Sequence, residues 1–203
     1  MQQYNQFEKE IRAVPDDEEI IALGQVSQDV RRSLPNDWVY YIKVESVTSP
    51  DEKEIIYREG LTEVPNSALL NGMYAIFLEK TRKDTDAAEA YFKRAIEADP
   101  KEASNLGNYA LFLTDVRKDA DDAEAYFKRA IEADPKHANI LGSYALFFKN
   151  VRKDADDAET YFKRAIEADP RHANNLGNYA LFLTDTRKDA DAAEAYFKRR
   201  SEE

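Results

Sequence analysis

Hydrophobic and polar positions repeat along this chain with a period of 35 residues from about Pro65 onward. The segment AEAYFKRAIEADP ends at Pro100 and recurs unchanged at Pro135. It returns with one change at Pro170, and a shortened copy ends at Arg199. Such repetition is typical of a solenoid, in which each unit packs mainly on its neighbours and the stack offers an extended surface. The pattern predicts a binding architecture without specifying the bound molecule.

Each unit holds two helical patterns, which span 103–116 and 121–134 in the second copy. In the second pattern Ala123, Phe127 and Ala130 follow i, i+4, i+7 spacing and form one apolar stripe. An Asp-Pro pair then ends the helix, because the residue before proline is driven out of the helical region. The connector RKDA is short and polar, so we expect the two helices to be antiparallel neighbours.

The start of the second helix carries a capping-box pattern, Asp121 followed three residues later by Glu124. The pattern predicts that Asp121 caps the helix and that Glu124 also pairs with Lys128 one turn on. The RKD runs before these helices form a charged row, which is interpreted either as a solvated edge or as a docking site for an acidic partner. The Asp and Glu pair recurs as Asp86 and Glu89, Asp156 and Glu159, and Asp191 and Glu194.

The second helix resembles that of the tetratricopeptide repeat family, a helix–turn–helix solenoid. Its small Ala123, aromatic Phe127, small Ala130 and closing Pro135 fall at the family's mutual spacing. The resemblance implies an all-α fold, a right-handed α-solenoid of antiparallel helix pairs. It covers residues 66–203, which divide into units 66–100, 101–135, 136–170 and 171–203.

The first helix follows the family less closely. The chain has Leu106, then Tyr109-Ala110 and then Leu113 where the family usually has Trp, Leu-Gly and Tyr. Ala110 still provides the small side chain that lets helices approach closely. The period is also one residue longer than the family's usual length of about 34, and we place the extra residue in the RKDA connector.

Residues 36–65 are interpreted as a diverged helix-pair unit. The later part, IIYREGLTEVP, places Tyr57, Gly60 and Leu61 where the repeats have Phe, Ala and Ile. The earlier part, DWVYYIKVESV, is expected to be a helix, although its β-branched and aromatic residues would equally suit a strand. Residues 1–35 are expected to form an N-terminal helical cap over the first repeat.

The last copy has Arg200-Ser201 where the earlier copies have Ala-Ile. A long charged side chain at an inward position is costly unless nothing packs over it. Two interpretations follow: the array ends here with a polar outer face, or the chain is cut in mid-helix.

The charge of the chain limits its partners. The net charge is −11, of which residues 1–65 carry −7, with 7 basic and 14 acidic side chains. Such a surface repels phosphate backbones, which argues against nucleic acid, including the RNA bound by pentatricopeptide repeats of similar length. Disulfides are excluded because the chain has no cysteine. No apolar run approaches the roughly 20 residues of a bilayer span, and the N-terminus lacks a secretory signal's apolar core, so we expect a cytoplasmic protein without a membrane partner.

The units differ mainly in the first helix, and in this family the first helices line the concave groove. Residues 101–135 and 136–170 differ at eight positions, six of them in that helix. We expect these six differences to vary the groove from unit to unit: Ser104/Asn139, Asn105/Ile140, Asn108/Ser143, Leu113/Phe148, Thr114/Lys149 and Asp115/Asn150. Its i, i+4, i+7 and i+11 positions share one face. They hold amides, hydroxyls and leucines, which suit an extended peptide because an amide both donates to and accepts from a backbone. The alternatives are a solvated face and accidental drift between copies. The predicted partner-binding residues are Ser104, Asn108, Leu111, Asp115, Asn139, Ser143, Leu146, Asn150, Asn174, Asn178, Leu181 and Asp185.

Glycine recurs inside the first helix, where it costs up to about 1 kcal/mol relative to alanine. Either a ligand backbone or an adjacent first helix is expected to approach closely there. Lys149 is expected to be an isolated cation of the groove. The positions of the family's carboxylate clamp hold glycine and leucine, so binding of chaperone tails is not expected. The four glycines are Gly72, Gly107, Gly142 and Gly177.

No motif in the sequence points to catalysis. His137 and His172 lie one repeat apart, which is roughly 10 Å in stacked helix pairs and too far to share a metal. The Asp-rich segments lack the spacing of an EF-hand loop, and neither a phosphate-binding loop nor a nucleophile elbow is present. We expect no cofactor, no metal and no enzymatic activity.

The sequence predicts a non-enzymatic scaffold that binds a peptide or helix of a partner protein in its concave groove. One alternative is a self-associating repeat protein, because near-identical units offer the same interface repeatedly. The other is a targeting arm for a small effector or regulatory domain in residues 1–65.

Overall fold

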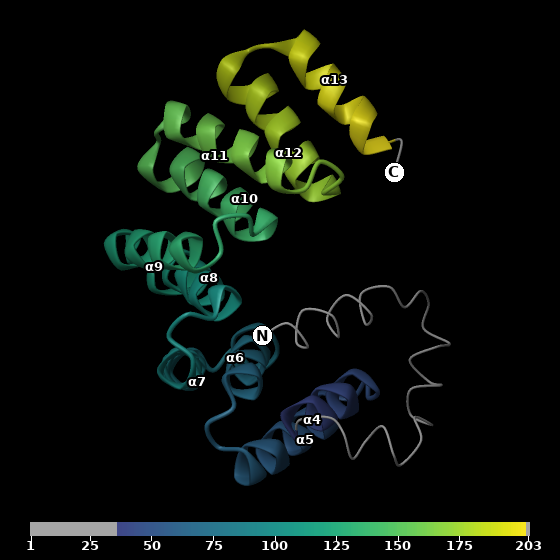
Figure 1. Cartoon of the computed structure of the whole chain (residues 1–203), viewed down its shortest axis with the longest axis vertical. Helices are drawn as coiled ribbons and strands as arrows, with labels where there is room; N and C mark the ends of the chain where they lie inside the picture. Colours follow the sequence, from purple (N-terminus) through teal and green to yellow (C-terminus); the bar gives the residue numbers. More distant parts are fainter. Residues whose placement is uncertain (1–35, 202–203) are drawn as a thin grey trace.

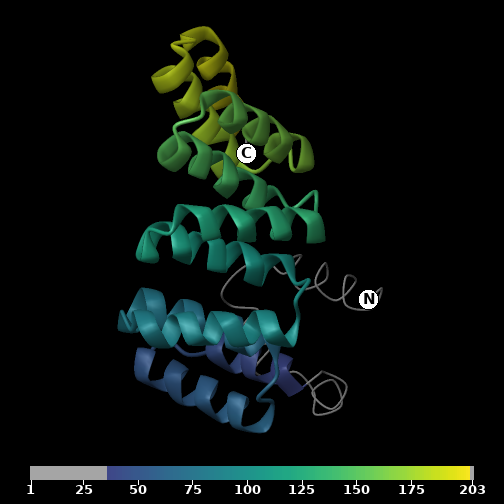
Figure 2. The same ribbon diagram turned by 90° about the vertical axis from the view of Figure 1, so that its left-hand side faces the viewer.

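The computed structural model describes residues 36–201, and the expected cap over residues 1–35 lies outside this part of the chain. Within it, α-helices follow one another in antiparallel pairs that stack into a right-handed solenoid (Figure 1 and Figure 2). The described residues contain no strand, and none of their helices is both long and apolar enough to cross a membrane. The all-α solenoid expected from the repeats is confirmed. Where separate domains begin and end stays a prediction.

The described residues hold five helix pairs, each made of a first and a second helix. Consecutive pairs lie against one another along the stack (Figure 2). The pairs are α4 (Asn36–Glu45) with α5 (Pro50–Glu63), α6 (Ala68–Phe77) with α7 (Thr85–Ala98), α8 (Ala103–Phe112) with α9 (Ala120–Ala133), α10 (Ala138–Phe147) with α11 (Ala155–Ala168), and α12 (Ala173–Phe182) with α13 (Ala190–Ser201).

The segment that suited helix or strand equally is the helix α4. Its Tyr40 and Val44 are buried. The Tyr40 ring lies so close to Gly60 of α5 that an added Cβ would be 2.7 Å from Tyr40 Cγ. Asp37 accepts a hydrogen bond from Ser67 Oγ at 2.9 Å, which ties α4 to the start of α6. This segment forms a helix because its aromatic side chains pack against neighbouring helices. Gly60, at the position of an alanine in the later copies, leaves room for the Tyr40 ring.

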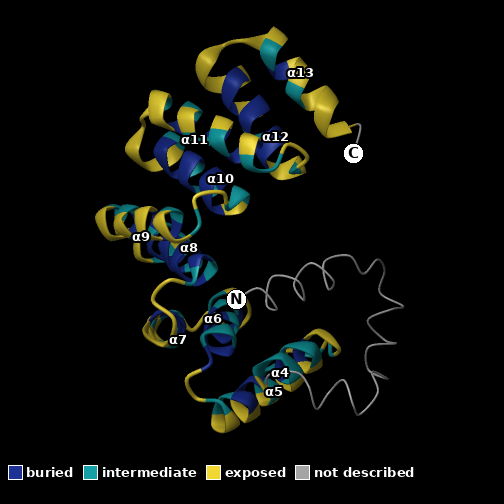
Figure 3. Ribbon diagram, viewed as in Figure 1, coloured by how far each residue is buried: buried dark blue, intermediate teal, exposed yellow. Residues whose placement is uncertain are grey.

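Buried residues recur along every helix pair of the stack (Figure 3), and many of them are alanines or aromatic residues. Ala123, Phe127 and Ala130 are fully buried, as their stripe predicts. Phe127 packs on two rings of the next first helix, with ring centres 5.1 Å from Tyr144 and 5.6 Å from Phe147. Such pairs add about 0.5–1.5 kcal/mol beyond the area they bury. Because the same pairing recurs in the adjacent units, contacts between units stabilise the fold.

The first helices α6, α8, α10 and α12 each end in a π-helical turn before the polar connector begins. A π turn contains one residue more than an α turn, because its hydrogen bonds run from i to i+5. The extra residue of the 35-residue period therefore lies in the helix, and its expected place in the RKDA connector is wrong. The turns are η1 (Leu78–Arg82), η2 (Leu113–Arg117), η3 (Phe148–Arg152) and η4 (Leu183–Arg187).

The residue after each π turn is a lysine in the left-handed conformation. Lys118 has φ 59°, and its N–H donates to Leu113 O. Asp119 N–H bonds the same carbonyl at 3.0 Å and closes the turn. The Asp119 side chain then caps α9 by accepting from the N–H of Asp122 at 3.1 Å. The expected cap at Asp121 is wrong, because α9 has already begun before that residue.

The acids expected to cap the second helix instead bind an arginine of the next unit. Arg152, at the end of η3, reaches back to Asp121 and Glu124 of α9, with an N–O distance of 2.7 Å to each. Its guanidinium carbon also lies 5.5 Å from the centre of the Phe147 ring. We call this contact the arginine clamp. It recurs at Arg82, Arg117 and Arg187.

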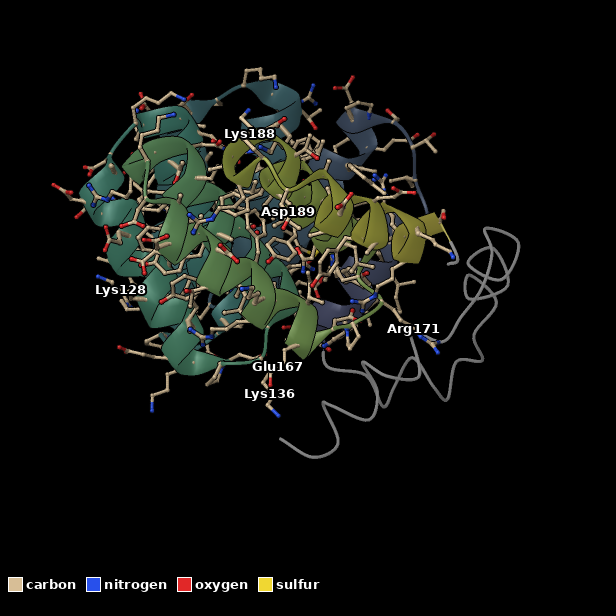
Figure 4. The ribbon with its side chains drawn as sticks, turned by 90° about the horizontal axis from the view of Figure 1, so that it is seen from above. Lys128, Lys136, Glu167, Arg171, Lys188 and Asp189 are labelled. Carbon is tan, nitrogen blue, oxygen red and sulfur yellow. The ribbon has the colours of Figure 1, made fainter. Side chains whose placement is uncertain are left out.

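Each RKD run therefore has three structural roles. Its arginine forms the clamp, its lysine closes the π turn and its aspartate caps the second helix. Figure 4 shows Lys188 and Asp189 in the turn between α12 and α13, while Lys128, Lys136 and Arg171 project outward from the rim of the stack. The charged row is thus a set of junctions between units, and docking of an acidic partner there stays a prediction.

The clamp makes stability depend on pH. The ammonium of Lys128 and the guanidinium of Arg152 lower the pKa of the Glu124 carboxyl below its usual value, and Glu89 and Glu159 have matching partners. A carboxyl with a lowered folded-state pKa stabilises the fold above its unfolded pKa, and this stability is lost as pH falls through the folded value. We expect the free energy of unfolding, measured by urea denaturation, to fall between about pH 5 and pH 3. The fall should be smaller when these three glutamates are replaced by glutamine.

The matched control replaces three exposed glutamates near the ends of the second helices by glutamine. These side chains make no ion pair with a described residue, so the control should keep the pH dependence of the original chain. Equal pH dependence in the clamp variant and the original chain would contradict the ionic role of the clamp. The control positions are Glu97, Glu132 and Glu167.

Candidate functional site

The predicted partner-binding residues lie on one side of α8, α10 and α12 and the π turns that follow them. All twelve are half-buried or exposed, and Leu181 is 47% exposed. Between α10 and α12 this side is hollowed into a depression of about 220 Å³. Five predicted residues meet there, and the other seven lie beside it on the same faces. The depression is lined by Asn139, Gly142, Ser143, Leu146, His172, Asn174, Asn175 and Asn178.

Neighbouring first helices approach one another closely at glycine. Asn175 is 3% exposed and donates through Nδ2 to Ala138 O at 2.9 Å, across the contact between α10 and α12. Its Oδ1 occupies the space that a Cβ on Gly142 would need. Close packing between first helices therefore explains this glycine, whereas at Gly177 of α12 the nearest side chain is Arg200 of α13.

The same contact holds α6 to α8, where Asn105 donates to Ala68 O at 3.1 Å beside Gly72. Between α8 and α10 the amide is replaced, and the side chain of Ile140 packs against Gly107. Asn105 and Ile140 are 7% and 5% exposed. The expectation that this pair of residues varies along the groove is wrong, because both side chains are buried between helices.

A second expected groove difference also lies in the core. Leu113 and Phe148, at the starts of π turns, are 4% and 8% exposed. Phe148 stacks on Tyr161 with ring centres 5.5 Å apart and lies 4.6 Å from Tyr144. The Tyr144 hydroxyl has no hydrogen-bond partner among the described residues, whereas that of Tyr109 donates to a glutamate at 3.2 Å. The larger ring changes core packing, and it leaves the groove unchanged.

The two histidines lie at the starts of first helices. His172 caps α12, because its Nδ1 accepts from the N–H of Asn175 at 3.3 Å. His137 Nε2 lies 3.4 Å from Ser104 Oγ of α8. Within residues 36–201, no three acidic or histidine side chains are grouped to hold a metal. The histidines contribute to helix ends and to the contact between units.

Lys149 is paired, so its expected isolation is wrong. Its Nζ lies 3.9 Å from Asp185 Oδ2, and the pair joins the π turns that follow α10 and α12. The groove face therefore offers amides, hydroxyls and leucines, with this ion pair near one end.

The profile of the tetratricopeptide repeat family matches residues 81–138 and 152–201, which together make up more than half of the chain. With the stacked helix pairs described above, this match shows that the chain belongs to the tetratricopeptide repeat family. Its architecture is that of a scaffold for protein–protein interaction.

Several solved structures share the fold. PilF of Pseudomonas aeruginosa gives a TM-score of 0.70 at 18% identity, over 82% of this chain and 74% of its own. PilW, described as a widely conserved type IV pilus biogenesis factor, gives 0.66 at 24% identity, over 83% and 79%. A thermophilic tetratricopeptide repeat protein of Thermus thermophilus gives 0.64 at 16% identity, over 75% and 82%. Identities this low show the fold alone. Comparison with curated protein sequences gave no match.

The substitution Gly142→Ala tests the close contact between first helices. The added Cβ overlaps Asn175 Oδ1, so we expect the free energy of unfolding to fall by about 1–3 kcal/mol. This loss should appear although alanine favours a helix by up to about 1 kcal/mol. Urea denaturation measures the change.

The control for this variant is Ser143→Ala, on the neighbouring half-buried position, with an expected change within about 0.5 kcal/mol. Adding Asn175→Ala to Gly142→Ala removes the overlap and should recover part of the loss. A Gly142→Ala chain that is more stable than the original would show that the helices are not packed as described.

Proposed function

We propose that the concave face of α8, α10 and α12 binds an extended peptide segment of a partner protein. The main support is a row of polar side chains with unused hydrogen-bonding groups. Asn108, Ser143 and Asn178 stand at equivalent positions of successive units and are half-buried. None of them makes a side-chain hydrogen bond within residues 36–201. Amides and hydroxyls in this position can both donate to and accept from a peptide backbone.

Leucines beside this row add apolar contacts for the peptide. Leu111 and Leu146 are half-buried and Leu181 is exposed, again at equivalent positions one unit apart. An extended chain alternates backbone polar groups with side chains that point to opposite faces. Polar and apolar positions repeated from unit to unit suit such a ligand better than they suit a compact partner.

The charge of the chain favours a neutral or basic peptide. The net charge is −11, and Asp115 is an exposed acid at the end of the predicted face. A surface of this sign raises the local concentration of cationic segments and repels acidic ones. The proposed ligand is therefore an extended segment without net negative charge.

Selection from random displayed peptides on the full-length chain tests this proposal. We expect peptides to be recovered and to lose about tenfold or more in affinity for the variant Asn139→Glu with Asn178→Glu. The reason is that each substitution replaces an amide of the depression, which donates and accepts, by a longer carboxylate, which only accepts and would be desolvated under the peptide. Fluorescence anisotropy measures the affinity, and circular dichroism verifies that the helix content is unchanged.

The matched control carries the same two charges on second helices, as Ala125→Glu with Thr160→Glu. Both positions are exposed on α9 and α11, away from the groove. Peptide affinity should be retained in this control. Equal losses in the two variants, or no loss in the groove variant, would refute binding in the groove.

The other expectations from the sequence stay predictions. Self-association is consistent with the exposure of Phe197 on α13, which is 38% exposed, whereas the equivalent Phe127 is 0% exposed. A targeting role for residues 1–65 also stays a prediction. A cytoplasmic location and the absence of membrane and nucleic-acid partners likewise stay proposals.

A further inference from the structure

A larger cavity lies on the side of α6 that is turned away from the groove. Its volume is about 650 Å³, and it is bounded by α5, α6 and α7. Asn71 and Tyr74 of α6 and Leu78, the first residue of η1, form one side of it. Met73 and Ile76 occupy the groove positions of the same unit and, at 100° per residue, lie on the opposite face of the helix. The cavity is therefore independent of the proposed peptide groove.

The lining of this cavity departs from the repeat pattern in charge or polarity at three positions. Its Thr62 stands where later copies have glutamate, and its Ala87 stands where the next two copies have aspartate. Asn71 stands where all later copies have leucine. These positions are scattered in sequence over α5, α6 and α7, and the fold brings them to one place.

The departures reverse the charge of the lining. Here three arginines face two carboxylates, Glu54 and Asp84. The equivalent positions one unit on hold three cations and four carboxylates. This junction has two fewer carboxylates than the next one and the same number of cations, so its charge favours an anion. The three arginines are Arg58, Arg82 and Arg94.

The arginines differ in how far they are already paired. Arg82 forms the clamp to α5, and Arg58 binds Glu54 and the Tyr74 hydroxyl. Arg94 makes no ion pair with a described residue, and its guanidinium carbon lies 4.8 Å from the centre of the Tyr91 ring. A guanidinium held in place over a ring and left without a counter-ion can bind a carboxylate or phosphate through two parallel hydrogen bonds.

Asn71 provides a second, independent indication of a ligand. Its side chain is 1% exposed and lines the cavity. Its Nδ2 donates to Pro65 O at 3.0 Å and to Ser67 O at 2.8 Å, while its Oδ1 has no partner among the described residues. A buried amide oxygen without a donor destabilises the fold, and the leucine of the later copies avoids this cost.

We propose that the cavity between α5, α6 and α7 is a binding site for an oxyanion, a carboxylate or phosphate group, with Arg94 as its main contact. Arg58 of α5 also lines the cavity and supplies a second guanidinium. The unpaired Asn71 oxygen accepts from a ligand that also carries an N–H or O–H group. An aspartate or glutamate of a peptide and a phosphate monoanion both meet this description.

Titration of the full-length chain with inorganic phosphate, and separately with the acetylated, amidated peptide DDEE, tests the site. The probe is the Nε–H NMR signal of Arg94, assigned by its loss in Arg94→Gln. We expect a saturable shift in the original chain. In Thr62→Glu with Ala87→Asp the apparent affinity should fall about tenfold, because two carboxylates return to the lining. This variant restores residues that later copies carry at the same positions, so its fold should be kept.

Arg129→Gln is the matched control, because Arg129 lies over Tyr126 at the next junction as Arg94 lies over Tyr91. It should leave the affinity unchanged. An equal affinity in Thr62→Glu with Ala87→Asp, an equal loss in Arg129→Gln, or a shift that does not saturate would overturn the proposal. None of these substitutions touches the groove, so peptide binding there is tested separately.

A last comparison identifies the source of the oxyanion. The chain itself carries the acidic run DDEE at residues 16–19. If neutralising this run to NNQQ tightens binding of the added DDEE peptide, the chain's own carboxylates occupy the site. If the affinity is unchanged, the site is open to an external carboxylate or phosphate. Either result is consistent with an oxyanion site and assigns its source.

Discussion

The close approach of neighbouring first helices at glycine determines the shape of this protein. Because Gly142 has no Cβ, Asn175 can reach across to the main chain of α10. Away from this contact, rings such as Phe127 and Tyr144 fill the space between a second helix and the next first helix. First helices consequently contact one another more than second helices do. Units that approach more closely on one side stack in a curve, and the proposed groove lies on the inside of that curve.

The π turn and the arginine clamp add the second constraint between units. One extra residue per unit widens the end of the first helix, and the turn brings Arg152 within 2.7 Å of Asp121 and Glu124 of the preceding unit. The sequence pattern could not distinguish this role from a capping box, because both need an acid at the same two positions near a helix start. Only the stacking of units shows which partner the acids meet, and that partner lies 28 to 31 residues away.

The sequence predicted the second helix best, because the spacing of Ala123 and Phe127 directly reflects burial. The predicted groove face also lies on one side of the first helices, although Asn105 and Phe148 proved to be buried. A difference between copies shows that a position varies. It does not show whether the side chain is buried against a neighbour that changes with it. The cavity beside α6 was missed, although Thr62 and Ala87 depart from the repeats. Their common location becomes visible only when three helices are placed together.

Distances between spin labels test the curvature most directly. The chain has no cysteine, so labels can be attached to introduced pairs alone. One pair, Ser104→Cys with Asn174→Cys, joins first helices two units apart, and the other, Ala90→Cys with Thr160→Cys, joins second helices over the same separation. We predict a shorter distance between the labels on the first helices. An equal or longer distance there would contradict a groove lined by first helices.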